Sequence, residues 1–306
     1  MKRLLVTGVT GLLGINLALD AVKKGYQVLG WVNTRRLKGV PFEQDVVSLE
    51  DLSLLPEKLE QARVDAVIHC AAIANLDLAQ KDPELARRVN AEAPGVLAET
   101  ARKMSIPIVQ ISTDSVFDGA AGNFREDDLP NPQNIYAQSK LVGEKAVCQA
   151  YSEALIARVV FYGWSPSGSR SLAEFVYNNL SQGKPINGFT DSIFSPLYVR
   201  DLGDLLLLAL ENELSGTYHF FSGQSLSKYD FAVGLARRFG FDENLITPVL
   251  TAQGGLQTKR PLNLSMNAEK LQTALNQDLP TVDHGLERLY QDWENGLRQQ
   301  ILTFLA

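Results

Sequence analysis

The chain has 306 residues, enough for one large domain or two smaller ones. Its 29 Lys and Arg against 35 Asp and Glu give a net charge of −6 at pH 7, with no basic block that could follow a nucleic-acid backbone. A nucleic-acid partner is therefore not expected. The apolar start breaks at Thr7 and Gly8, and the longest later apolar run, 205–210, is too short for a bilayer. We expect a cytoplasmic protein without a membrane segment, whose Cys70 and Cys148 are buried free thiols.

Short apolar runs alternate with longer amphipathic segments through the first half of the chain. The runs predicted to be strands are 3–6, 26–32, 46–47, 66–68, 106–111 and 154–160. The segments predicted to be helices are 11–24, 50–62, 82–104 and 134–151. This alternation favours parallel strands joined by right-handed helical crossovers, the doubly wound α/β fold of Rossmann type. Ligands of such sheets bind beyond the carboxyl ends of the strands.

The pattern changes at about residue 162, where clusters of glycine, proline and serine begin. We expect residues 1–161 to form a dinucleotide-binding domain, to which some later segments return. Residues 162–306 are expected to form mainly a smaller, mixed α/β lobe that binds the substrate.

Three glycines, Gly8, Gly11 and Gly14, follow the first expected strand and open the first expected helix. Glycine lets the backbone turn tightly and approach a pyrophosphate, whose charge is met by amide N–H groups at the helix N-terminus. This context predicts a dinucleotide site, and a tight turn without a ligand is the alternative. The residues of the turn expected to contact the cofactor are Gly8, Thr10, Gly11, Leu12 and Leu13.

The second expected strand ends in Asn33, Thr34 and two arginines, where chains that bind the unphosphorylated dinucleotide usually carry a carboxylate. Arginine matches a phosphate with a planar fork of donors. Asn33, Arg35 and Arg36 are therefore expected to favour NADPH, with NADH the less favoured cofactor. A solvated loop with two arginines is the alternative. Further expected contacts, at the third strand, are Asp45 and Val46.

Tyr136 and Lys140 lie four residues apart near the start of an expected helix, so they share one face. A phenol has a pKa near 10, and we expect the nearby ammonium and a positive nicotinamide ring to lower the pKa of Tyr136. The fifth expected strand ends in Ser112 and Thr113, and the Thr113 hydroxyl could hydrogen-bond a substrate carbonyl. By itself a Tyr-x-x-x-Lys pair is common on ordinary helices, and hydroxyl residues are ordinary at strand ends.

Three motifs follow one another along the chain: the glycine turn, the strand end at 112–114, and the Tyr136 and Lys140 pair. In this order they resemble the motifs of the extended short-chain dehydrogenase/reductase family. More narrowly, segments 112–119 and 132–140 resemble the dTDP-4-dehydrorhamnose reductase-like branch. The resemblance covers nearly the whole chain, including 69–72, 89–91 and 259–261.

The resemblance implies an NAD(P)-dependent oxidoreductase whose catalytic set is Thr113, Tyr136 and Lys140. Hydride would pass from NADPH to the C4 carbonyl of a nucleotide-activated deoxy sugar while Tyr136 protonates the oxygen. Lys140 would also hold the nicotinamide ribose. Further implied cofactor contacts are Cys70, Ala71, Ala72, Asn90 and Ser112. Implied substrate contacts are Asp114, Ser115, Phe117 and Arg260, where Arg260 would meet a diphosphate or is simply a solvated loop arginine.

Family members act on small molecules, so we expect a carbonyl substrate such as a nucleotide sugar and a monomer or homodimer. Some use a magnesium ion between subunits, but no residue here identifies its ligands. His69, His219 and His284 are isolated in the sequence, so no metal set is expected among them.

Ser115 departs from the branch, which commonly has a tyrosine after Thr-Asp, and this leaves the sugar open. Related dehydratases carry glutamate there, so a dehydratase is disfavoured. Two alternatives remain: a cofactor-binding regulatory subunit similar to the beta subunit of methionine adenosyltransferase, and a sugar-nucleotide epimerase that retains NAD. Retention of Thr113, Tyr136 and Lys140 favours catalysis, and the lack of a carboxylate near Asn33 argues against retained NAD.

Overall fold

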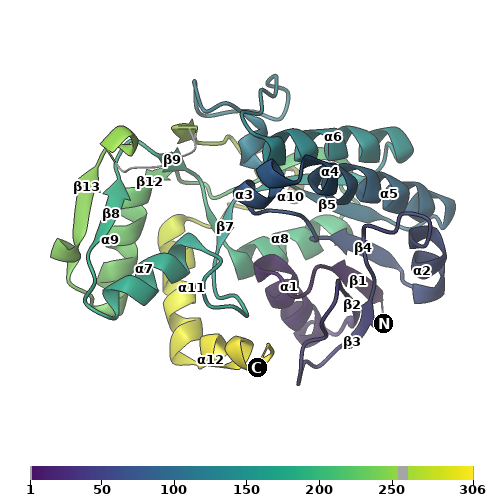
Figure 1. Cartoon of the computed structure of the whole chain (residues 1–306), viewed down its shortest axis with the longest axis horizontal. Coiled ribbons are helices and arrows are strands. Elements are labelled where there is room, and N and C mark those ends of the chain that lie inside the picture. The colour runs from purple at the N-terminus through teal and green to yellow at the C-terminus, as the bar shows by residue number, and fades with distance from the viewer. Residues whose placement is uncertain (1, 254–260, 306) are drawn as a thin grey trace.

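A parallel sheet forms the centre of the larger part of the molecule (Figure 1). The structure is a computed structural model that describes residues 2–253 and 261–305. Within these residues the sheet has seven strands. In spatial order they are β11 Gly216–Phe220, β6 Leu155–Val159, β5 Ile108–Thr113, β4 Ala66–His69, β1 Arg3–Thr7, β2 Gln27–Val32 and β3 Glu43–Val46. Every neighbouring pair is parallel, which confirms the expected doubly wound α/β fold.

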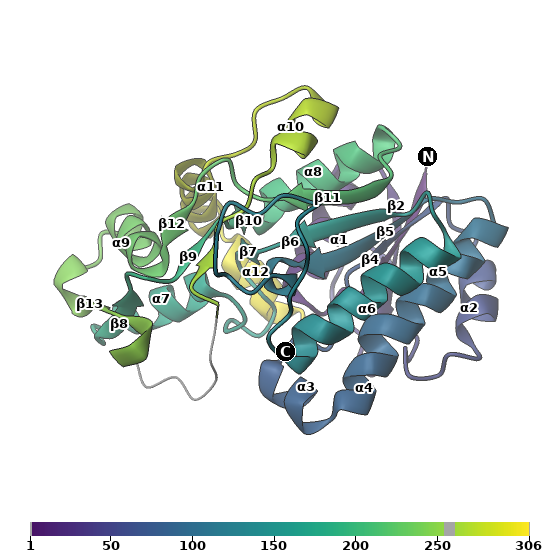
Figure 2. The same ribbon diagram turned by 90° about the horizontal axis from the view of Figure 1, so that it is seen from above.

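Helices cover both faces of this sheet (Figure 2). On one face lie α2 Leu55–Ala62, α3 Leu76–Lys81, α4 Pro83–Arg87, α5 Ala93–Lys103 and α6 Ile135–Ala150. On the other face lie α1 Leu12–Lys23 and α8 Val199–Glu211, which pack against each other. Because helices cover both faces, the inner strands are almost wholly buried and are predominantly apolar.

The direction of winding changes between β1 and β4. The chain runs outward from β1 through β2 to β3, then crosses back to place β4 on the other side of β1. Such a switch point leaves a crevice beyond the carboxyl ends of the strands, where doubly wound proteins bind ligands. The fold therefore places a ligand crevice beside the glycine turn.

A smaller lobe lies at the side of the sheet (Figure 1). Its strands are β7 Phe161–Tyr162, β8 Ile186–Phe189, β9 Ile193–Phe194, β10 Leu197–Tyr198, β12 Leu226–Ser227, β13 Ile246–Val249 and β14 Asn263–Leu264. Its helices are α7 Leu172–Leu180, α9 Lys228–Phe239, α11 Val282–Glu294 and α12 Leu297–Thr303, with short turns η3 Glu243–Leu245 and η4 Thr251–Gln253, while α10 Glu269–Leu275 packs on β11. Two later elements, α8 and β11, return to the sheet. The expected boundary at residue 161 stays a prediction.

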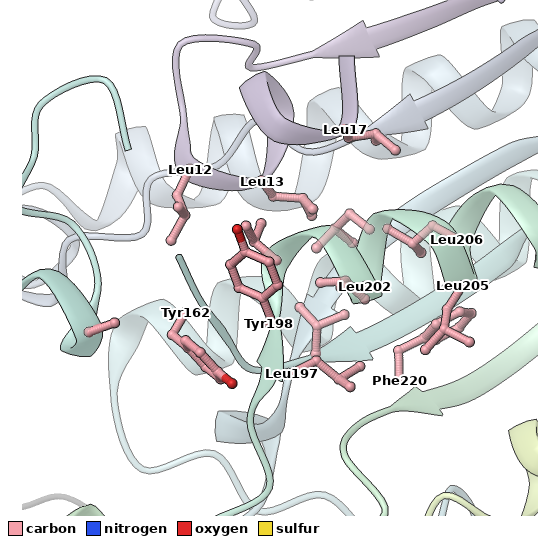
Figure 3. Close-up of a cluster of buried hydrophobic side chains, with 14 of the residues drawn as sticks. Leu12, Leu13, Leu17, Tyr162, Leu197, Tyr198, Leu202, Leu205, Leu206 and Phe220 are labelled. Carbon is pink, nitrogen blue, oxygen red and sulfur yellow. The ribbon is translucent and has the colours of Figure 1, made fainter. Parts of the chain in front are cut away.

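A cluster of buried apolar side chains joins the lobe to the sheet layers. Figure 3 shows Leu13 of α1 and Leu202 of α8 beside Tyr198, with Tyr162 and Leu197 nearby. The two tyrosine rings lie 5.9 Å apart between centroids. Burying a leucine side chain stabilises a fold by about 2 kcal/mol, so this cluster holds the lobe firmly against the helices of the sheet.

The helix expected at 82–104 is present but contains a π-helical turn, η1 Arg88–Glu92. Pro94 follows this turn and has no N–H to donate to the carbonyl of Asn90, four residues earlier. The regular α-helical hydrogen bonding therefore cannot continue through Asn90.

Three other expectations need correction. Strand β3 ends at Val46 instead of running through Val47, and α2 begins at Leu55 instead of residue 50, with Pro56 in its first turn. Cys148 is exposed, because it lies on the outer face of α6, whereas Cys70 is partly buried. No helix of the described residues is long and apolar enough to cross a membrane.

Candidate active site

The turn between β1 and α1 requires glycine at two positions. Gly8 has a φ of +68°, and a Cβ there would lie 2.8 Å from the Cα of Ala71. A Cβ on Gly14 would overlap the carbonyl of Gly8. Gly11 is the N-cap of α1 and makes no side-chain cap, so the first amides of this helix are left without a side-chain partner. The turn at residues 8–14, which we call the glycine cradle, therefore presents backbone N–H groups that fit the pyrophosphate of a dinucleotide.

A pocket of about 660 Å³ opens at the carboxyl ends of the central strands, beside this cradle. The expected site residues that line it are Gly8, Thr10, Gly11, Leu12, Leu13, Asn33, Cys70, Ala71, Ala72, Ser112, Thr113, Asp114, Ser115, Tyr136 and Lys140. The fold therefore brings the glycine turn and the Tyr-x-x-x-Lys pair into one pocket, although they are far apart in the sequence.

Several expected site residues lie outside the pocket lining. Phe117 is 1% exposed and stacks on Phe124, with 4.4 Å between the ring centroids. Asp45 and Val46 lie on the exposed edge strand β3. Arg260 falls outside the described residues.

The two arginines after β2 differ in their surroundings. Arg36 donates a hydrogen bond to the carbonyl of Gln44, and its guanidinium lies 3.8 Å from the Asp45 carboxylate. Arg35 is exposed, and within the described residues its guanidinium has no hydrogen-bond or ion-pair partner. Neither arginine lines the pocket, whereas Asn33 does.

The three expected catalytic residues come from β5 and α6. Thr113 ends β5, and Tyr136 lies in the first turn of α6, whose N-cap Asn134 accepts a backbone N–H bond. Lys140, one turn later, is 3% exposed and donates to the carbonyl of Ile111 at 2.6 Å. A strand end and a helix start thus hold the hydroxyl, the phenol and the ammonium at one wall of the pocket.

Burial sets the protonation of this group. It raises the pKa of Tyr136 to about 12, with a Thr113 hydrogen bond acting in the opposite direction. It lowers the pKa of Lys140 to about 8, opposed by Glu144 and then Cys70. The residues alone therefore do not produce the expected lowering of the Tyr136 pKa, because burial outweighs the other influences. At neutral pH the phenol keeps its proton and Lys140 is mainly protonated.

Asp114 follows Thr113 in the short turn η2 Asp114–Val116 and faces the pocket. Its Oδ1 accepts hydrogen bonds from the hydroxyls of Thr113 at 3.0 Å and Ser115 at 3.2 Å. Burial raises the pKa of Asp114, and Lys228 of α9 acts in the opposite direction. Lys228 belongs to the lobe, so a charge of the lobe favours the ionised form of this pocket carboxyl.

Asn90 supports the pocket from outside. Its Oδ1 accepts the N–H of Ile73 at 2.8 Å, and its Nδ2 donates to the Ile73 carbonyl at 3.0 Å and the Ser139 hydroxyl at 2.9 Å. Ser139 in turn donates to the Tyr136 carbonyl at 2.7 Å. Gly143 lets α6 approach the same turn, since a Cβ there would overlap the Asn90 carbonyl. The π-helical turn thus fixes both the Ile73 loop and the start of α6.

Pocket residues that the sequence did not indicate come from segments with weak local signals. They are Val47, Leu49, Glu50, Ile73, Val159, Val160, Phe161 and Arg170, among others. Because β3 ends at Val46, the residues that follow it reach the pocket in place of Asp45 and Val46. The rule that ligands lie beyond strand ends would have indicated Val47 and its successors once the end of β3 was known.

The described residues contain no group of three or more His, Cys, Asp or Glu that could hold a metal ion. His69 is buried, with its Nδ1 2.8 Å from the Thr7 hydroxyl, and burial lowers its pKa to about 3. His219 is also buried, and its pKa is lowered to about 4. Both rings are neutral packing groups of the core at neutral pH.

The fold and the pocket together define an NAD(P)-dependent oxidoreductase of the extended short-chain dehydrogenase/reductase class. The chain belongs to the RmlD substrate binding domain family, which matches residues 1–295. This confirms the expected branch of that class.

The chain is similar in sequence and structure to several known proteins. The probable low-salt glycan biosynthesis reductase Agl14 of Haloferax volcanii is 32% identical over 289 residues, which is 93% of this chain and 96% of that protein. Methionine adenosyltransferase 2 subunit beta of Xenopus laevis is 30% identical, covering 89% of this chain and 82% of that protein. The structure of dTDP-4-dehydrorhamnose reductase from Bacillus anthracis in complex with NADP has a TM-score of 0.85 and 27% identity, covering 95% of this chain and 99% of that chain.

Proposed function

We propose that the protein reduces the C4 ketone of a nucleotide-linked 4-keto-6-deoxy sugar, with NADPH as the reductant. One observation carries the proposal: the glycine cradle and the Thr113, Tyr136 and Lys140 side chains line a single pocket. When bound, NADPH supplies a hydride to the carbonyl carbon. The similarity to a dTDP-4-dehydrorhamnose reductase bound to NADP supports both the substrate class and the cofactor.

The side chains of this chain supply the proton. Tyr136 gives its phenolic proton to the carbonyl oxygen as that oxygen gains charge, which converts the ketone to a hydroxyl. The Thr113 hydroxyl donates a hydrogen bond to the same oxygen, and the Lys140 ammonium stabilises the phenolate left behind. The raised pKa of Tyr136 suits this direction, because reduction must begin from a protonated phenol.

The substrate is tested by measuring NADPH oxidation with a panel of nucleotide-linked 4-keto-6-deoxy sugars. Turnover of one or more members is the expected result, and the preferred member identifies the nucleotide and sugar. Tight NADPH binding without turnover of any sugar in the panel would contradict the substrate assignment. It would favour the second candidate, a cofactor-binding regulatory subunit. The 30% identity to methionine adenosyltransferase 2 subunit beta supports this candidate.

The cofactor preference is tested with Arg35→Ala. We propose that Arg35 meets the 2′-phosphate, because it lies just beyond β2 and its guanidinium has no partner among the described residues. A hydrogen bond to a charged group contributes about 1.5–3 kcal/mol, so the Kd for NADPH should rise about 10- to 150-fold while the Kd for NADH stays constant.

Arg36→Ala is the matched control, since Arg36 already binds the Gln44 carbonyl and lies near Asp45. Its effect on NADPH binding should be much smaller. Equal losses of NADPH and NADH binding in Arg35→Ala would contradict a role in 2′-phosphate recognition.

A further inference from the structure

We propose that Glu144 is a positioning residue for the reaction: its carboxylate keeps Lys140 protonated and holds α6 against the end of β5. The importance of Lys140 rests on the function proposed above, whereas its protonation can be measured without cofactor or substrate. Glu144 lies one helical turn after Lys140 and does not line the pocket. It therefore acts on the reaction only through its neighbours.

The Glu144 carboxylate is buried and held in one orientation. Arg158 of β6 donates from Nε to Oε1 at 3.0 Å and from Nη2 to Oε2 at 2.9 Å. The Ser112 hydroxyl donates to Oε1 as well. Both members of the ion pair are at most 6% exposed at their side chains, and the guanidinium carbon of Arg158 lies 5.1 Å from the ring centroid of Phe117. A planar guanidinium that binds both oxygens leaves the carboxylate little freedom to rotate.

Lys140 and Glu144 attach one face of α6 to two consecutive residues of β5. Lys140 donates to the carbonyl of Ile111 at 2.6 Å, and Glu144 accepts from the side chain of Ser112. The next residue along β5 is the catalytic Thr113. These two attachments therefore set the position of the phenol in the first turn of α6 relative to the threonine hydroxyl at the end of β5.

The negative charge of Glu144, although paired with Arg158, also favours the protonated form of Lys140 one helical turn earlier. The other titratable groups at this wall of the pocket are His69, Cys70, Asp114 and Tyr136. Burial raises the pKa of Cys70 to about 12 and lowers that of His69 to about 3, so both are neutral at neutral pH. The charge of Asp114 acts on Tyr136, which keeps its proton. Within the described residues, Glu144 is thus the carboxylate whose charge acts on Lys140.

The test is a pH titration of Lys140 by NMR, on ligand-free protein labelled with ¹³C-lysine. The Lys140 signal is identified by its absence in Lys140→Arg. In Glu144→Gln the ammonium loses its counter-charge and Arg158 is left unpaired, so the midpoint of the titration should fall by about one pH unit or more. A folded Glu144→Gln protein with the wild-type midpoint would overturn the proposal.

Two further variants separate this role from a purely structural one. Asp20→Asn is the control. On α1, Asp20 forms a comparable ion pair, in which Arg200 binds both carboxylate oxygens at 2.7 Å. Its loss should leave the midpoint of the Lys140 titration unchanged. If Glu144→Gln does not fold, the double variant Glu144→Gln/Arg158→Gln decides, because it leaves no unpaired guanidinium. Its midpoint should also lie below that of the wild type, and an unchanged midpoint would overturn the proposal.

An enzymatic measurement then links the titration to the reaction. The decline of kcat at alkaline pH should begin at lower pH in Glu144→Gln than in the wild type, by the same shift as the NMR midpoint. A wild-type protein that reduces none of the sugars would contradict the proposed function, while the NMR result would still decide the role of Glu144.

Discussion

Tyr136 and Lys140 share one wall of the pocket, yet burial moves their pKa values in opposite directions, because it disfavours the charged form of each. The phenol therefore starts the reaction protonated, which suits a proton donor. The ammonium remains protonated below about pH 8 and can stabilise the phenolate that forms. Burial thus keeps the donor protonated, whereas the charge of Glu144 opposes the effect of burial on the ammonium.

The pH dependence of kcat should report the loss of the Lys140 proton. Lys140 is protonated below its pKa of about 8 and neutral above it, whereas Tyr136, with a pKa of about 12, keeps its proton throughout this range. We expect the wild-type kcat to decline as pH rises through about 8. In Lys140→Met, kcat should be low at every pH and lack this decline. A wild-type kcat that stays constant well above pH 8 would contradict this role.

At the scale of single residues, the sequence predicted the class of reaction. It did not predict what surrounds the individual side chains. The family resemblance and the four-residue helical spacing predicted that Thr113, Tyr136 and Lys140 share one site, and all three line the pocket, while their catalytic roles stay predictions. The partner of Arg36 depends instead on how β2 and β3 pair, and the exposure of Cys148 depends on which face of α6 packs on the sheet. Neither pairing nor packing can be read from the neighbouring residues alone.

Among the elements, α6 supplies two of the three expected catalytic side chains. Its first turn presents Tyr136, its second presents Lys140, and Gly143 lets it approach the π-helical turn η1 closely. The sequence predicted this helix within one residue at each end, since Asn134 is a strong N-cap. The π-helical turn was not predicted, although Pro94 in the expected helix was a visible signal for irregular hydrogen bonding.

Gly143→Ala should destabilise the protein by about 1–3 kcal/mol, because the new Cβ would overlap the Asn90 carbonyl and force α6 away from η1. Urea denaturation measures the loss. Gly203→Ala is the matched control within α8, where the nearest atom to a new Cβ is Leu17 Cδ1 at 3.7 Å. It should stabilise by up to about 1 kcal/mol, as alanine does within a helix. Equal free energies of unfolding for the two variants would refute the tight packing at Gly143.

For the whole molecule, the sequence predicted a parallel sheet and a second lobe, but not how they join. The run at 205–210 was visible as apolar, yet its packing against α1 is a contact between distant segments. Strand β11, Gly216–Phe220, is short and pairs with β6 at the sheet edge. The assembled core around Tyr162 and Tyr198 decides both which strand β11 pairs with and where the lobe lies.

Arg200 of α8 reinforces this junction, because it binds Asp20 of α1 and Asp292 of α11. Arg200→Met would remove the guanidinium that pairs two mostly buried carboxylates, so we expect a loss of about 3 kcal/mol in the free energy of unfolding. Arg237→Ala removes an exposed ion pair with Glu243 and should leave the free energy of unfolding nearly unchanged. Similar values for both variants in urea denaturation would show that the junction does not depend on Arg200.

The most direct test of the central claim compares Tyr136→Phe with Tyr151→Phe in the NADPH-dependent reduction of the preferred sugar. Tyr151 lies at the other end of α6, outside the pocket, and serves as the control. Loss of a general acid lowers a rate by about 10²- to 10⁴-fold, so Tyr136→Phe should lose that much kcat while its Kd for NADPH stays near the wild-type value. Tyr151→Phe should keep the wild-type kcat. A Tyr136→Phe enzyme that reduces the sugar as fast as the wild type would contradict the account.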